Sequence, residues 1–517
     1  MPAERPTVLV LGGGLAGLTV GRALQANGFA VTILEASPRA GGKAGCAPGV
    51  DGELWEHGYH IFAPWYANMR RLTDELGVKL IEIPHWHYIE RAADGVLPPS
   101  AGGPAPRRAR MMLPTTPAEL IETLRNAPLP AAEMLLYFYF VLDMIGKPIS
   151  QKGLLDQVSR VGFMRDRWYA TPVWPRIERE SLLKASAVPA FEMSAYTAKI
   201  LSSYFLRTMR PSLMILPGDL QRTLIDPYVG RVTAGGVTIE YGCKAKRLVM
   251  GSGTRPQIAA VDVESADGTQ ARSADVYVVT TPLDVTRELI TSDILAHDPD
   301  LGSIQRLRVA PMAALHLELV DRRSDIPAEH VFLSGGRYGL SFIDCTPHWP
   351  ACKTTVLSFI ASDFMPLRSL SEAEQYALLM DEIGRYLPLR MKDVRRWQLN
   401  TNTRDGLRLF INTAGSWPDR PDPSCRIDNL FFAGDWVKNK VDLACMEGAV
   451  SAAHQAAHDI GERWKAWNGI TVPPPPLVAP RYPPWLVRLA VIAMAPLVAL
   501  IYAWARLSPD PPDATGS

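Results

Sequence analysis

A glycine-rich loop near the N-terminus constrains the fold of this chain more than any other feature. The hexapeptide at residues 12–17, GGGLAG, follows the short apolar run Thr7–Leu11 and precedes a segment with helical periodicity. A short apolar run that stops at glycine is typical of a buried parallel strand. Val31–Leu34 reads as a second strand, and Glu35 closes it. This strand–helix–strand order predicts a dinucleotide-binding unit.

The loop residues have distinct predicted roles. Gly12 permits the tight turn, Gly14 admits a pyrophosphate, and Gly17 lets helix and strand pack closely. Leu15 and Ala16 begin the helix, whose free N–H groups and partial positive charge favour phosphate. Glu35 is placed to accept hydrogen bonds from ribose hydroxyls. The alternative interpretation is that Glu35 is a solvated glutamate at the end of a strand.

The residues after Glu35 extend the pattern. The stretch ASPRAGGK includes Ala36, Arg39, Gly41, Gly42 and Lys43. It resembles the second signature of the flavin amine-oxidase and carotenoid-desaturase superfamily, which implies FAD rather than NAD. In that family the two glycines admit the pyrophosphate and an arginine usually follows. Lys43 keeps the charge but lacks the planar fork. Arg39 either compensates or is an exposed loop charge.

A histidine-containing segment follows. Residues 56–62, EHGYHIF, are similar to the segment that plant- and cyanobacterial-type phytoene desaturases place beside the flavin. The resemblance implies flavin contacts for Glu56, His57 and Gly58. His57 and His60 are candidate catalytic bases, but packing and backbone hydrogen bonding are at least as common for histidines in such a segment. Flavin N5 itself is expected to carry out the chemistry.

The second half of the predicted cofactor site lies near residue 440. Residues 430–433 read as a buried strand that ends at Gly434-Asp435, where an open parallel sheet binds its ligand. The resemblance implies that Asp435 holds the ribityl or phosphate region of the flavin. A carboxylate fits there if it accepts from a ribityl hydroxyl while backbone N–H groups carry the phosphate.

A small-residue helix begins eleven residues later. Its N-terminus is predicted to direct its positive end at the flavin and to stabilise the charge of the reduced ring. The residues involved are Met446, Glu447, Gly448 and Ala449. By family position, backbone groups near Lys244 and Ala245 bind adenine. The stretch AGDWVKNKVDLACMEGA is similar to plant-type desaturases and their hydroxysqualene dehydroxylase relatives.

The predicted fold class is α/β. A Rossmann-type, glutathione-reductase-like FAD-binding domain is interrupted by a mixed α+β substrate domain, and a C-terminal apolar helix follows. We expect a loop over 91–114, a helix at 134–145, and strands at 244–250, 258–264 and 271–279. The expected domains are FAD-binding parts at 1–90, 218–300 and 400–465, substrate parts at 91–217 (mostly helical) and 301–399, a proline-rich linker at 466–484, and a membrane anchor at 485–507.

Composition and charge limit the classes of partner and ligand that we expect. The chain has 54 basic and 53 acidic side chains, a net charge of +1, which argues against nucleic-acid binding. Its six scattered cysteines lack metal-ligand spacing, so no metal site is expected. No secretion signal is visible, and we expect the catalytic domain on the cytoplasmic side of a membrane.

The C-terminal segment predicts membrane association. Residues 485–505 are almost wholly apolar, with aromatic and arginine residues near their ends. This segment is barely long enough to cross a membrane. The sequence is therefore compatible with a transmembrane helix and with a helix that lies in the membrane interface. The preceding prolines argue against docking of this helix into the core.

The resemblance implies hydride removal from a hydrophobic isoprenoid or carotenoid-like substrate to FAD, with a quinone or oxygen as electron acceptor. Three alternatives remain at this stage. The chain could be an oxidase or dehydroxylase of another lipid-like, polycyclic or amine substrate, a non-redox polyene isomerase, or a non-catalytic prenyl-lipid escort protein.

Overall fold

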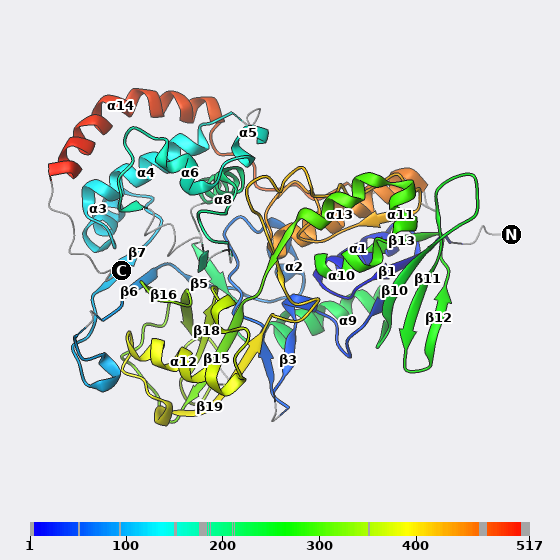
Figure 1. Ribbon diagram of the computed structural model, residues 1–517, viewed down its shortest axis with the longest axis horizontal. Helices are drawn as coiled ribbons and strands as arrows, with labels where there is room; N and C mark the ends of the chain where they lie inside the picture. The colour runs from blue at the N-terminus through cyan, green and yellow to red at the C-terminus, as the bar shows by residue number, and fades with distance from the viewer. Residues whose placement is uncertain are drawn as a thin grey trace.

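The computed structural model places the parallel-sheet region at one end of the molecule and a helical region at the other (Figure 1). The structure describes residues 5–49, 52–92, 95–148, 152–174, 183–184, 186, 188–208, 210, 212–349, 352–464 and 473–507. Part of the predicted linker, residues 466–472, lies outside the described residues, as do residues 93–94 of the predicted loop.

The first region is a five-stranded parallel sheet in the order β21-β13-β1-β2-β9. The central strands are fully buried, as expected of apolar strands with helices on both faces. Because all strands are parallel, the loops after β1, β2, β13 and β21 emerge at one edge. The strands are β1 (Thr7–Leu11), β2 (Ala30–Glu35), β9 (Thr238–Tyr241), β13 (Val276–Val279) and β21 (Leu430–Phe432).

Helices α1 (Leu15–Ala26) and α13 (Met446–Trp464) pack side by side in this region (Figure 1). Small residues permit that approach, since Ala452, Ala453 and Ala456 are completely buried. Around them lie α2 (Ala67–Glu75), the π-helix Gln221–Ile225, α9 (Asp226–Ala234), α10 (Leu283–Leu289) and α11 (Ser292–His297).

An antiparallel meander flanks the parallel sheet. Its last strand ends earlier than the sequence predicts. It contains β10 (Lys244–Met250), β11 (Ile258–Ser265) and β12 (Gly268–Arg272). Asp267-Gly268 lies at the turn between β11 and β12, with Gly268 at φ +100°. The single strand predicted at 271–279 is wrong. The chain leaves the meander after Arg272 and enters the parallel sheet as β13, because the two sheets need different strand directions.

The second region contains a seven-stranded mixed sheet in the order β19-β15-β18-β17-β16-β6-β7. Strand β7 (Arg108–Met111) pairs with β6 (Trp86–Glu90), so the loop predicted over 91–114 is wrong at its C-terminal end. Alternation at Ala109 and Met111, which are buried between exposed arginines, was the missed signal. The others are β15 (Ala313–Leu319), β16 (His330–Ser334), β17 (Leu340–Asp344), β18 (Val356–Ala361) and β19 (Val394–Thr401).

Helix α12 (Glu372–Gly384) contributes to the core of this sheet, and its N-terminus has a capping box at Ser371 and Glu374. Three short strand pairs link the regions. They are β3 (Cys46–Pro48) with β4 (Leu54–Glu56), β5 (Ile81–Ile83) with β8 (Leu213–Ile215), and β14 (Arg308–Ala310) with β20 (Leu409–Ile411).

The helical region has its own apolar core. Helix α14 (Pro484–Leu507) lies along α4 (Figure 1), where Tyr139 donates to the Val491 carbonyl at 3.0 Å. The expectation that this helix stays undocked is therefore wrong, because Val491 and Val498 are buried in that core. The other helices are α3 (Pro117–Asn126), α4 (Ala131–Ile145), α5 (Lys152–Asp156), α6 (Arg160–Arg165) and α8 (Ala195–Arg207).

Candidate cofactor site at the edge of the parallel sheet

The glycine loop after β1 is determined by backbone contacts. Gly12 has φ +114°, and its N–H donates to the Leu34 carbonyl at 2.8 Å. A Cβ on Gly17 would lie 1.9 Å from the Gly12 carbonyl oxygen, so only glycine fits there. Leu15 and Ala16, both buried, begin α1 directly after the loop.

Gly14 differs from its neighbours because its α-carbon faces free space. A Cβ there would meet nothing closer than the Gly41 carbonyl oxygen at 3.8 Å. Nothing in the protein fold therefore requires glycine at this position. A ligand phosphate that approaches the backbone does require it, and the residues fit a dinucleotide at this point.

Glu35 supports the loop with its side chain. One carboxylate oxygen accepts from the Gly13 N–H at 2.6 Å, and the other accepts from the Ser37 N–H at 2.8 Å and from the Ser37 hydroxyl. The Glu35 carbonyl accepts from the Cys243 N–H at 2.9 Å. That bond places Lys244 and Ala245, the predicted adenine neighbours, at the same edge, while Ala36 and Arg39 are exposed in the following loop.

The second signature packs against the first. The Gly41 N–H donates to the Gly13 carbonyl at 2.9 Å, and Gly41 and Gly42 have φ values of +126° and +57°. Lys43 Nζ lies 3.9 Å from Asp435 Oδ2, with both side chains 22% exposed. Residues almost 400 positions apart therefore meet at one sheet edge, as the sequence predicts.

The turn after β21 is fixed from inside the protein by an arginine that the sequence reading missed. Arg420 is completely buried and donates to the carbonyls of Trp436 and Val437 at 3.1 and 2.7 Å. Burial lowers the pKa of its guanidinium, whereas Asp442 and Asp435 raise it. No local motif around Arg420 predicts this contact, because the carbonyl groups that accept its hydrogen bonds belong to a separate segment.

The start of α13 places Gly448 and the side chain of Glu447 in different surroundings. A Cβ on Gly448 would lie 2.1 Å from the Leu443 carbonyl oxygen, so the tight entry to the helix needs glycine. Met446 and Ala449 flank this entry and are half-buried. The carboxylate of Glu447 does not face an open site. It accepts from the N–H groups of Asn68 and Met69, both at 2.9 Å, and holds the start of α2.

The burial of Glu447 has an electrostatic consequence. Burial raises the pKa of this carboxyl to about 7, against the hydrogen bonds from Asn68 and Met69, which lower it. The side chain of Glu447 therefore holds the start of α2, and a cofactor contact through the backbone of this residue stays a prediction.

The segment at residues 56–60 joins the parallel-sheet region to the seven-stranded sheet. The Glu56 carboxylate accepts from the Leu220 N–H at 2.7 Å, and its carbonyl accepts from His316 Nε2 at 2.7 Å. A Cβ on Gly58 would lie 3.3 Å from the Ile360 side chain. Burial, with His60 and His316 nearby, lowers the pKa of His57 to about 4. A histidine with this pKa is neutral at pH 7 and a weak base.

A buried polar group lies beside this junction. Tyr59 Oη is 2.7 Å from His330 Nε2 and 2.6 Å from Ser341 Oγ, and burial lowers the pKa of His330 to about 3. The cavity next to Tyr59 and His60 has a volume of only about 20 Å³. Arg306 and Arg308 form ion pairs with Asp419 and Glu192, and both arginines are exposed.

Comparison with known proteins identifies the class. Residues 15–461 match the family described as flavin containing amine oxidoreductase. The chain belongs to this family, and it is an FAD-dependent oxidoreductase. That result removes the non-catalytic escort alternative. Among the described residues, no group of three or more metal-ligating side chains comes together.

Curated relatives include 15-cis-phytoene desaturases. The protein from Synechococcus elongatus is 23% identical over 466 residues, covering 88% of this chain and 95% of its own. The carotenoid phi-ring synthase of Streptomyces griseus is 24% identical, covering 89% of each chain. Among solved structures, putrescine oxidase bound to putrescine superposes with a TM-score of 0.65 at 17% identity, covering 88% of this chain and 99% of its own. That structural likeness shows the fold alone.

Proposed function

We propose that the protein removes hydride from a hydrophobic, isoprenoid or carotenoid-like substrate that it takes from a membrane surface. The observation that carries this proposal is the placement of α14. One face of this helix packs on α4, and the opposite face presents large apolar side chains to solvent. They are Trp485, Leu489, Ile492, Leu497, Leu500 and Trp504, each more than half exposed.

An interfacial attachment explains α14 better than a span. By length and composition it is the one helix among the described residues that could cross a membrane. Arg488, however, pairs with Asp143 of α4 at 2.7 Å. A spanning α14 would either break this ion pair or draw charged residues of α4 into hydrocarbon, which is costly. Lying in the interface, the helix keeps its docked face and gives its outer face to lipid.

The chemistry needs placement and exclusion of water more than a strong protein base. When bound, FAD supplies the hydride acceptor. The chain's own residues at the junction are suited to this task, because His57 is neutral and the Glu56 carboxylate is occupied by the Leu220 N–H. The phytoene desaturase relatives support a polyene substrate. A quinone or oxygen would serve as the final electron acceptor of such a reaction.

Anaerobic reduction of the bound flavin tests this proposal. Protein in vesicles receives a C40 polyene, a diamine or buffer, and flavin absorbance is followed. Bleaching by the polyene alone, reversed by a quinone, is the expected result. Bleaching by the diamine alone would assign the enzyme to amine oxidation. A polyene that changes geometry without bleaching the flavin would indicate an isomerase.

A further inference from the structure

A second cavity lies in the helical region, lined by residues of α5 and α6 and by the segments next to them. It has a volume of about 390 Å³, within the range of roughly 300–1,000 Å³ typical of small-molecule sites. Its apolar wall is Leu154, Leu155, Val158 and Phe163, and Leu154 is 73% exposed at the rim. The remaining lining residues are Gly162, Asp166 and two cations, Lys147 and Arg167.

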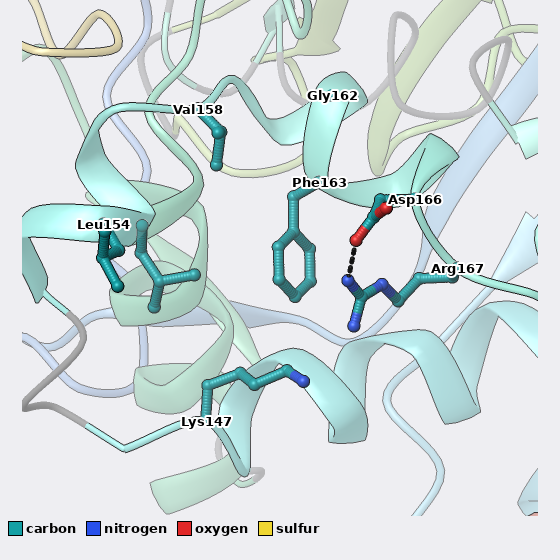
Figure 2. A pocket seen from close by; sticks show the side chains of 8 residues that line it. Lys147, Leu154, Val158, Gly162, Phe163, Asp166 and Arg167 are labelled. Atoms are coloured by element: carbon teal, nitrogen blue, oxygen red, sulfur yellow. Dashed lines mark hydrogen bonds and ion pairs between the residues drawn. The ribbon is translucent and has the colours of Figure 1, made fainter.

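The two cations converge beside an aromatic ring (Figure 2). Arg167 Cζ lies 4.6 Å and Lys147 Nζ 5.9 Å from the Phe163 ring centroid. Both side chains are less than one-fifth exposed, so they are held at the cavity rather than extended into solvent. An apolar wall next to paired cations matches an amphipathic anion.

Within the described part of the chain, the ion-pair network beside this cavity has more cations than carboxylates. Asp143 is the common partner of Arg488, Lys147 and Arg167, at 2.7, 3.7 and 3.7 Å. Asp166 pairs with Arg167. The buried Lys199 donates to the Lys147 carbonyl. These four cations face two carboxylates. Burial and the nearby charge of Lys147 together lower the pKa of Lys199 to about 8.

The cavity also borders the surface that we assign to the membrane. Arg488 belongs to α14, and a Cβ on Gly146, next to Lys147, would lie 3.3 Å from the Arg488 backbone. Trp168, next to Arg167 and 55% exposed, contacts Tyr502 of α14 with ring centroids 6.1 Å apart. These two contacts place the cavity beside α14.

We infer that this cavity binds the phosphate headgroup of an anionic phospholipid, with Lys147 and Arg167 as its cationic contacts and Leu154 and Val158 against the start of an acyl chain. The site would fix the depth and rotation of the protein on the membrane. It rests on the membrane association proposed above, and it adds a specific lipid to that association.

Vesicle flotation of the full-length protein tests this site. Vesicles of phosphatidylcholine are compared with vesicles that also contain phosphatidylglycerol. We expect about ten-fold stronger binding to the second kind. The double variant Lys147→Gln/Arg167→Gln should lose this preference. Arg247→Gln is the matched control, because it removes an exposed cation from β10 at the other end of the molecule and should change nothing (Figure 1).

A second variant gives an effect in the opposite direction. Asp166→Asn removes a carboxylate that competes for Arg167, so binding to phosphatidylglycerol vesicles should rise about five-fold. Misfolding cannot produce this gain, so the Asp166→Asn result decides the question if the double variant fails to fold. Flavin content per chain checks the fold of each variant.

The outcomes separate this inference from the proposed membrane association. Equal binding to both vesicle types would overturn the headgroup site and leave the attachment of α14 intact. The headgroup site would also be overturned if the flavin-loaded double variant kept its full preference for phosphatidylglycerol vesicles. The same holds if Arg247→Gln lost as much of that preference as the double variant. Failure to bind any vesicle would overturn the membrane association and the site together.

Discussion

The parallel-sheet region and the helical region under α14 are stabilised by different kinds of contact. In the glycine loop after β1 the decisive contacts are between backbones, such as the Gly12 N–H to Leu34 carbonyl bond and the contact that excludes a side chain at Gly17. In the helical region the decisive contacts are between side chains, as around Asp143. Close backbone contacts require glycine and can therefore be recognised in the sequence, whereas the side-chain network around Asp143 has no such sequence pattern.

The largest expected effect is at Gly17. Gly17→Val places a side chain against the Gly12 carbonyl, and we expect a loss of about 3 kcal/mol in the free energy of unfolding together with loss of FAD. Thermal unfolding and flavin absorbance measure both. Gly230→Ala in α9, where a Cβ meets nothing within 4 Å, is the control. Equal stability of Gly17→Val and Gly230→Ala would contradict the claim that close backbone contacts determine the glycine loop.

The pH dependence of stability reports on Glu447. Its pKa is raised from 4.5 to about 7 by burial, so the folded protein holds a proton that the unfolded chain loses. The resulting stability is fully present below pH 4.5 and is lost as the pH rises to about 7, a change of about 3 kcal/mol. Glu447→Gln should remove this slope in denaturant titrations at several pH values. Exposed Glu264→Gln should retain it.

Gly14→Val separates ligand binding from folding. The position has room for a side chain within the protein, so the fold should persist. The side chain would collide with the pyrophosphate, and FAD affinity should fall about fifty-fold. Equilibrium dialysis with FAD measures this change. A variant that binds FAD normally would contradict the predicted role of the loop.

These glycines show how much of the molecule the sequence predicts. The first strand–helix–strand unit, the loop at 12–17 and the meeting of the N-terminal segment with the segment around residue 435 follow from glycine spacing and from the rule that parallel strands end at one edge. Strand β7, the buried Arg420 and the docking of α14 do not follow. Arg420 and α14 depend on partners from separate segments that no local pattern specifies, whereas β7 has a local signal in the alternation of buried Ala109 and Met111 with exposed arginines.

Acidic substitutions on the outer face of α14 test the other region. Leu489→Glu/Leu500→Glu changes two side chains that are 54% and 70% exposed, so folding should be preserved. Partitioning onto membranes should fall about ten-fold, because two apolar contacts with lipid are lost. Sedimentation with membranes measures it. Unchanged sedimentation would contradict the assignment of this face to lipid.

The smallest expected effect is at Lys43. Its ion pair with Asp435 is long and partly exposed, so Lys43→Met should change the free energy of unfolding by less than about 1 kcal/mol. FAD affinity should fall only a few-fold, since backbone groups carry most of the phosphate contact. Lys43→Arg should restore it. A large loss of stability in Lys43→Met would show that side chains matter at this edge as much as they do around Asp143.

The central claim is that two distant stretches of the chain bind one FAD at a single sheet edge. The most direct measurement is FAD content per chain for the unaltered protein, Asp435→Ala and the Gly230→Ala control. We predict one FAD per chain in the first and third, and strongly reduced loading in a folded Asp435→Ala variant. Full loading of Asp435→Ala would contradict the claim.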